Sequence, residues 1–95
     1  MVSLRWNMTL NPNFITQEMG DDTLLIPVGK AAESFHGLIR LNETAAFIVS
    51  QLGQETTPAA IADAMLAEYE VDRPTAEANI AQILDQLRSV GALVE

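Results

Sequence analysis

The segment FHGLIRLNETAA, residues 35–46, changes from a strand pattern to a helix pattern and decides the fold class. Side chains in Phe35–Leu41 would alternate between the two faces of an extended strand. Asn42 then provides a good N-cap, and the apolar residues within Glu43–Leu52 recur with helical spacing. The segment therefore predicts a strand that leads directly into a helix.

Two more strands are predicted before this segment. Phe14–Met19 and Thr23–Val28 are rich in β-favouring residues, and Gly20–Asp22 between them is typical of a tight turn. Because Pro27 has no backbone N–H, we expect the end of the second strand to lie at a sheet edge or a bulge. Together with Phe35–Leu41, these segments predict a three-stranded antiparallel sheet.

Three helices are predicted after the sheet, over Glu43–Leu52, over Pro58–Tyr69 and in a last segment that begins after Asp72. A small N-terminal sheet followed by three helices gives an α+β fold with a winged-helix-like arrangement. We expect one such domain over residues 12–95. Residues 1–11 show no period and are expected to form a flexible N-terminal arm.

The composition and charge restrict the classes of function. The chain of 95 residues carries 5 Lys+Arg and 13 Asp+Glu, a formal net charge of −8. Since nucleic acids and anionic membrane surfaces attract cations, this balance argues against both as partners. Cysteine is absent, which excludes disulfides and thiolate sites, and no apolar run is long enough for a membrane span or a secretory signal. We therefore expect a soluble, cytoplasmic protein.

Residue patterns for catalysis or metal binding are absent from the sequence. His36 is the only histidine, and no spacing typical of a metal site, an activated serine or a phosphate-binding loop is present. A histidine acts as a general base only with a nucleophile and an orienting group beside it. We therefore expect neither an enzyme nor a bound metal or cofactor.

A winged-helix DNA-binding protein is an alternative, because the step from Tyr69 to Thr75 between the last two helices is short enough for a helix-turn-helix. The last helix of such a protein presents Arg, Lys, Asn or Gln to phosphates and bases. In this sequence the only cation at the outward positions of the last helix is Arg88, near its C-terminal end. The outward positions are Thr75, Glu77, Asn79, Gln82, Asp85, Gln86 and Arg88. The shape permits DNA binding, whereas the charges oppose it.

Four stretches resemble the PqqD family: LIPVG over residues 25–29, FHGLIRLNETA over 35–45, YEVD over 69–72 and LDQLRSVGAL over 84–93. The resemblance implies a recognition element for ribosomally synthesised and post-translationally modified peptides (RiPPs). Such a protein is a non-catalytic peptide chaperone that holds the leader segment of a precursor peptide and presents it to a modifying enzyme, often a radical SAM protein. The founding pathway makes pyrroloquinoline quinone (PQQ), but relatives serve other peptides, so the family does not specify the pathway.

The resemblance also implies where the leader peptide binds. In the family, the leader pairs with the third strand by β-augmentation and packs into the groove between that strand and the last helix. Carried onto this sequence, the implied peptide-binding residues are His36, Gly37, Leu38, Ile39, Arg40, Leu41, Ile80, Ile83, Leu84, Leu87 and Arg88. We expect about half of the four apolar helix residues to pack inside the core. Arg40 and Arg88 would form a positive spot if both point into the groove.

An open strand edge also permits pairing with a second copy of the chain. A homodimer is therefore compatible with leader binding, and a dimerising structural protein is a third interpretation. Light scattering separates the two, because a peptide chaperone can be monomeric and an edge-paired structural protein cannot.

Overall fold

The computed structural model describes residues 7–34 and 37–95, and this part of the chain contains five strands and four helices. In chain order they are β1 (Thr9–Leu10), β2 (Phe14–Met19), β3 (Asp22–Pro27), α1 (Lys30–Ser34), β4 (Ile39–Leu41), α2 (Glu43–Gln51), α3 (Pro58–Glu68), α4 (Arg73–Ser89) and β5 (Leu93–Val94). A three-stranded antiparallel sheet precedes the three long helices, so the predicted α+β class is confirmed. The additional short helix α1 connects β3 to the segment before β4.

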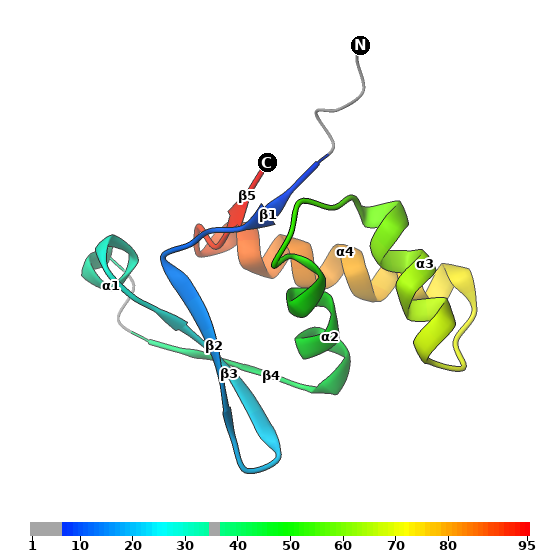
Figure 1. The fold of residues 1–95 in the computed structure, drawn as a ribbon, viewed down its shortest axis with the longest axis horizontal. Coiled ribbons are helices and arrows are strands. Elements are labelled where there is room, and N and C mark those ends of the chain that lie inside the picture. Colours follow the sequence, from blue (N-terminus) through cyan, green and yellow to red (C-terminus); the bar gives the residue numbers. More distant parts are fainter. Residues whose placement is uncertain (1–6, 35–36) are drawn as a thin grey trace.

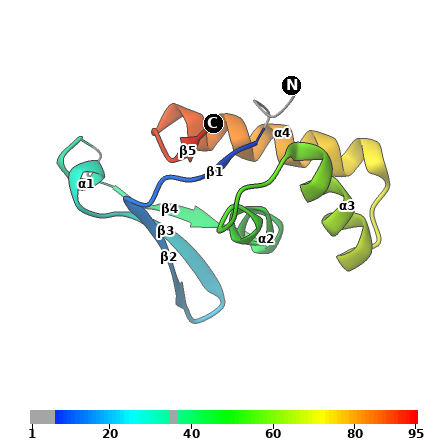
Figure 2. The same ribbon diagram turned by 45° about the horizontal axis from the view of Figure 1, so that its top comes forward.

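β3 is the central strand of the sheet, with β2 on one side and β4 on the other. β2 and β3 pair along their whole length, and Gly20 turns the chain between them with a φ of 65°. A positive φ favours glycine, in agreement with the predicted tight turn. β2 has the predicted bounds, whereas β3 begins and ends one residue earlier than Thr23–Val28. The hairpin formed by these two strands extends away from the long helices (Figures 1 and 2).

β4 is shorter than the predicted strand Phe35–Leu41. Residues 35 and 36 lie outside the described part of the chain, residues 37 and 38 are not in a strand, and pairing with β3 begins at Ile39. In a continued register the glycine at position 37 would lie opposite Pro27, which has no N–H to donate. Glycine is also a weak strand former. Among the described residues Pro27 pairs with Phe14 of β2 and has no partner in β4, so this end of β3 lies at a sheet edge, as expected. The predicted length of the third strand was wrong.

The expected flexible arm does not extend to residue 11. β1 pairs with β5 in an antiparallel ribbon, and Met8 exchanges backbone hydrogen bonds of 2.8 and 2.9 Å with Thr56. The Met8 side chain is buried in the core. A strand of two residues is too short to produce a period in the sequence, so the pattern did not reveal it. Residues 1–6 lie outside the described part of the chain.

Each long helix begins at its predicted polar cap. The side chains of Asn42, Thr57 and Asp72 accept hydrogen bonds of 2.8, 3.1 and 3.1 Å from backbone N–H groups in the first turn. These N–H groups have no partner within the helix, so the caps stabilise the helix starts. Because Asn42 follows β4 directly, its cap sets the point at which the strand becomes α2.

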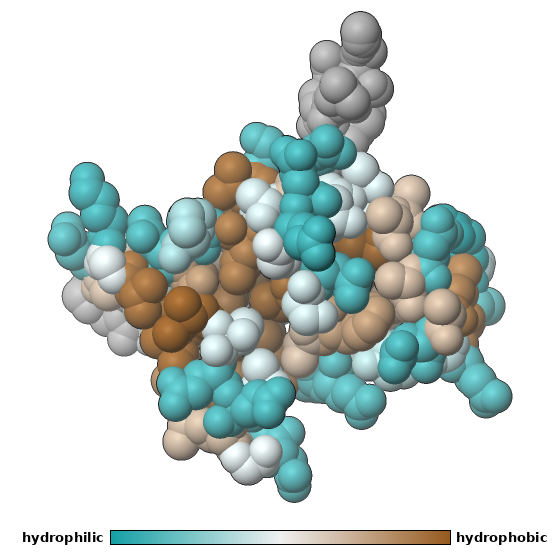
Figure 3. Space-filling model, viewed as in Figure 1, coloured by the Kyte–Doolittle hydropathy of each residue, from teal (hydrophilic) through white to brown (hydrophobic). Residues whose placement is uncertain are grey.

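The core lies between the inner face of the sheet and the helices α2, α3 and α4, and α4 packs against both other helices (Figure 1). Its fully buried apolar residues are Met8, Phe14, Leu25, Leu41, Ala45, Ile48, Val49, Leu52, Ile61, Ala62, Met65, Ala76, Ile80, Leu84, Leu87 and Ala92. The outer face of the sheet keeps some apolar side chains in solvent, among them Ile15 and Met19. Figure 3 shows hydrophobic residues gathered at the base of the β2–β3 hairpin.

Candidate functional site

β4 is an edge strand with one free side. It pairs with β3, and no other strand in the described part of the chain pairs with it. In an antiparallel sheet, successive residues direct their backbone N–H and C=O groups to alternate sides, so one or two of the residues Ile39–Leu41 point these groups away from β3. Such a free edge can accept an extended chain as an additional strand.

The side chains of β4 alternate between the core and solvent. Leu41 is 4% exposed and anchors the strand in the core, and Ile39, on the same face, is half-buried. Arg40 points to the other side with a side chain that is 74% exposed, and its guanidinium lies 3.8 Å from the Asp22 carboxylate. An ion pair this exposed and this long holds the arginine only weakly. Arg40 is therefore available to a ligand at the edge.

A cavity of about 310 Å³ lies beside this edge, and we call it the β4 groove. β4, the first turn of α2 and one side of α4 form its walls. The lining residues are Arg40, Leu41, Asn42, Thr44, Ala45, Asn79, Gln82, Ile83 and Gln86. The four α4 residues in this set are spaced by three, four and seven positions, so they form one stripe along the helix that faces β4.

The chemistry of the β4 groove suits contacts with a peptide. Asn79, Gln82 and Gln86 each carry an amide that both donates and accepts hydrogen bonds, and Ile83 supplies apolar surface. Arg40 is the only ionisable residue among those that line the groove. No group of three or more His, Cys, Asp or Glu side chains that could hold a metal ion occurs in residues 7–34 and 37–95. The groove can therefore bind polar backbone and side-chain groups with a small apolar contact.

The structure brings only part of the predicted site together. Gly37 and Leu38 are exposed at the start of the edge, with Leu38 54% exposed, and Ile83 lines the β4 groove. The other three apolar helix residues, Ile80, Leu84 and Leu87, are at most 3% exposed and pack in the core. Three of these four apolar residues are thus internal, rather than the half that we expected. His36 lies outside the described residues.

Arg88 does not join Arg40. Its guanidinium donates hydrogen bonds of 2.9 Å to Asp85 and to Glu95, and it lines a different cavity, on the α3 side of α4. Hydrogen bonding to Glu95 raises the pKa of Arg88 above its ordinary value, with a smaller contribution from Asp85. The two arginines therefore do not form the single positive spot that the sequence suggested.

Sequence reasoning missed the amides as groove residues. The sequence predicts Asn79, Gln82 and Gln86 only as outward positions of a DNA-binding helix, because it is the apolar stripe of the last helix that predicts the groove walls. The sequence carried no signal for them, since they share a stripe of α4 with Ile83, and only the structure shows that Ile83 is the partly exposed member of the four predicted apolar wall residues.

Residues 24–93 match the protein family described as coenzyme PQQ synthesis protein D (PqqD). The chain belongs to this family. The matched residues of this PqqD-family chain run from β3 to the first residue of β5, so they include β4 and every lining residue of the β4 groove.

Two solved structures are similar to the PqqD-family chain over nearly its whole length. One is described as TbiB1 in complex with the TbiA(beta) leader peptide; it is 26% identical, the match covers 90% of this chain and 93% of that one, and the TM-score is 0.71. The other is a lasso peptide synthetase B1 complexed with the leader peptide, at 30% identity, with 93% and 98% of the two chains covered and a TM-score of 0.73. No curated protein matches the chain.

None of the helices in residues 7–34 and 37–95 has the length and apolar character needed to cross a membrane.

Proposed function

We propose that this chain binds the leader segment of a ribosomally made precursor peptide along the free edge of β4, and that it does so without catalysing a reaction. One observation carries the proposal: a strand edge that no other described strand pairs with lies directly beside a groove in a PqqD-family chain. Two similar proteins have been solved with leader peptides, which supports a peptide as the occupant of the edge. The protein would act in the cytoplasm, where such precursors are made.

The binding mode follows from the geometry of the edge. The leader adds an antiparallel or parallel strand to β4, and its backbone takes up the outward N–H and C=O groups of Ile39–Leu41. Alternate leader side chains then point to opposite faces of the sheet. Those on the inner face enter the β4 groove, where they meet Ile83 and the neighbouring amides, and those on the outer face lie near Arg40 and Leu38.

Two enzyme partners follow from two different observations. The PqqD resemblance implies a radical SAM enzyme that modifies the precursor. The similarity to lasso peptide synthetase B1 chains favours a component of a lasso peptide synthetase instead. The genes beside this one distinguish them, because a small peptide gene and the gene of its modifying enzyme are expected next to the gene of the chaperone.

Isothermal titration calorimetry with a synthetic leader tests the proposal, using the leader sequence of the small precursor encoded beside this protein. We expect wild type to bind it and Arg40→Glu to bind it several-fold more weakly. Lys30→Glu is the matched control, because it makes the same change of charge on an exposed residue that does not line the β4 groove. Equal affinity of both variants would remove Arg40 from the site, and absence of binding by wild type would overturn the proposal.

Pairing of two copies at the same edge is the competing use of β4. A net charge of −8 on each copy opposes it, and we expect light scattering to give a monomer in moderate salt. The DNA-binding alternative is checked by a gel shift on duplex DNA at low salt, where we expect no shift because the chain repels phosphates. A dimer that the leader fails to dissociate, or a shifted duplex, would favour the corresponding alternative.

A further inference from the structure

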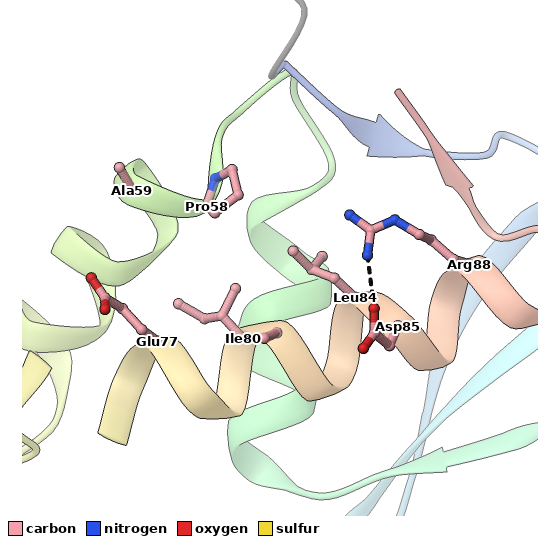
Figure 4. Close-up of a pocket in the computed structure, with 8 residues that line it drawn as sticks. Pro58, Ala59, Glu77, Ile80, Leu84, Asp85 and Arg88 are labelled. Carbon is pink, nitrogen blue, oxygen red and sulfur yellow. Dashed lines mark hydrogen bonds and ion pairs between the residues drawn. The ribbon is translucent and has the colours of Figure 1, made fainter. Parts of the chain in front are cut away.

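A second cavity, of about 380 Å³, lies on the opposite side of α4, between that helix and the start of α3, and we call it the α3–α4 groove. Its lining residues are Pro58, Ala59, Glu77, Ile80, Ala81, Leu84, Asp85 and Arg88. Figure 4 shows Ile80 and Leu84 pointing from α4 toward Pro58 at the first turn of α3. These two side chains are at most 3% exposed, so the apolar surface that the groove offers to a ligand comes from the exposed residues Pro58, Ala59 and Ala81.

The two grooves are separated by α4 itself. Successive residues of an α-helix are rotated by about 100° around its axis. On that geometry the residues that line the β4 groove, at positions 79, 82, 83 and 86, centre on a direction roughly 180° from those that line the α3–α4 groove, at positions 77, 80, 81, 84, 85 and 88. A ligand in one groove therefore leaves the other groove open.

Two ion-pair groups beside the α3–α4 groove carry excess negative charge, and Glu77, Asp85 and Arg88 are their members that line the groove. The Arg73 guanidinium forms ion pairs with two carboxylates, at 2.9 Å from Asp63 and 3.1 Å from Glu77. Arg88 likewise forms ion pairs with Asp85 and Glu95, each at 2.9 Å. Each arginine thus neutralises one of its two carboxylates, and each of the two groups keeps one net negative charge.

The negative charge beside the groove determines which kind of partner can bind there. A second copy of a chain with a net charge of −8 is repelled by this charge, and a cationic segment is attracted to it. An apolar side chain on that segment would cover Pro58, Ala59 and Ala81, while flanking lysine or arginine side chains would lie near the two groups of carboxylates. The segment would be compatible with a leader on the other side of α4.

We propose that the α3–α4 groove docks a cationic amphipathic helix of the enzyme that modifies the precursor. This rests on the proposed function, because a leader carrier has to engage its cargo and the enzyme at the same time. α4 then serves as the wall between the two partners, with the leader on the β4 side and the enzyme on the α3 side. Enzyme docking accordingly requires no release of the leader.

A pair of neighbouring variants on α4 tests the assignment. Ala81 and Gln82 are both exposed, and they line opposite grooves. Ala81→Arg and Gln82→Arg add the same charge, so general electrostatic repulsion of a cationic probe affects both alike. Ala81→Arg alone puts a long cation into the α3–α4 groove. The probe is a synthetic amphipathic helical peptide of leucine and lysine, titrated into the full chain and followed by backbone amide chemical shifts.

We expect the lysine peptide to shift the amides around Ala59, Ala81 and Asp85, and to bind Ala81→Arg at least about tenfold more weakly than Gln82→Arg. The same peptide with glutamate in place of lysine should not bind. Equal weakening by both variants, or shifts spread over the acidic surface without preference for the groove, would overturn the proposal.

Titration of the same variants with the leader keeps the two proposals distinct. Ala81→Arg should bind the leader as wild type does, because its groove is not the leader site. Loss of leader binding on Ala81→Arg would contradict two independent grooves. A wild-type chain that binds the lysine peptide and no leader would overturn the proposed function and, with it, the identity of the docked partner.

Discussion

Replacing two isoleucines that lie three residues apart on α4 with alanine should separate leader binding from folding. Ile83 lines the β4 groove and is half-buried, whereas Ile80 is 2% exposed and belongs to the core. We expect Ile83→Ala to reduce the affinity for the leader with a modest loss of stability. Ile80→Ala should reduce stability strongly and leave the affinity of the folded protein unchanged.

The magnitudes follow from how much of each side chain is buried. Isoleucine to alanine removes three carbon atoms, worth about 2.4 kcal/mol when they are fully buried, at about 0.8 kcal/mol each. Because Ile83 is partly buried, the leader can cover at most about a third of it, so its truncation costs at most about 0.8 kcal/mol of binding, or about fourfold in Kd. Truncation of Ile80 leaves a cavity in the core and costs about 2–5 kcal/mol of the free energy of unfolding.

Calorimetry with the leader gives the first quantity, and urea denaturation followed by circular dichroism gives the second. The calorimetry is done at a temperature at which both variants remain folded. Unchanged leader affinity for Ile83→Ala would refute the placement of the leader in the β4 groove. A larger loss of affinity for Ile80→Ala than for Ile83→Ala would mean that the leader contacts the other side of α4.

Three further predictions concern the parts of the chain that hold the site in place. Met8→Ala should lower the free energy of unfolding by about 2–5 kcal/mol, measured in urea, because the side chain is buried; a change near zero would support a flexible arm up to residue 11. Asn42→Ala should cost about 1 kcal/mol and Asn42→Asp much less in the same assay, since aspartate retains the cap of α2; equal losses would argue against a capping role. Hydrogen bonds from the Thr75 hydroxyl and N–H lower the pKa of Asp72. The ionised cap therefore stabilises the protein at a pH above the ordinary pKa of a carboxyl group, and this stabilisation is lost as the pH falls through the lowered pKa. The midpoint of urea unfolding should therefore depend less on pH below about pH 4 in Asp72→Asn than in wild type, and identical profiles would contradict this.

The parts of the fold with strong local signals could be predicted from the sequence. The polar caps Asn42, Thr57 and Asp72 mark helix starts because they satisfy N–H groups locally, and such signals need no tertiary information. The β1–β5 ribbon could not be predicted, because two-residue strands carry no period and their partner lies at the other end of the chain. The length of β4 depended on which residue of β3 it faces, and the register is a tertiary property.

The candidate site was predicted in position and only partly in composition. The edge strand and α4 were identified, but an apolar stripe does not reveal which of its residues face the core and which face a groove. Ile83 differs from Ile80 only by a rotation on the helix, and that rotation is fixed by packing against α2 and α3. The ion pair of Arg88 with Glu95 could not be predicted from the sequence either, because Glu95 approaches Arg88 only after the chain turns back at Gly91, where φ is 77°.

The shortness of β4 has a consequence for how tightly a guest is held. Three residues on an antiparallel edge expose one or two sets of backbone groups, which is two to four hydrogen bonds, each contributing about 0.5–1.5 kcal/mol net. With so few backbone hydrogen bonds, the leader peptide dissociates quickly unless its side chains make further contacts. A peptide carrier of this kind releases its modified product readily and can then bind the next precursor. The reason is that Pro27 ends the pairing of β3 with β4, and a longer β4 would hold the leader with more hydrogen bonds.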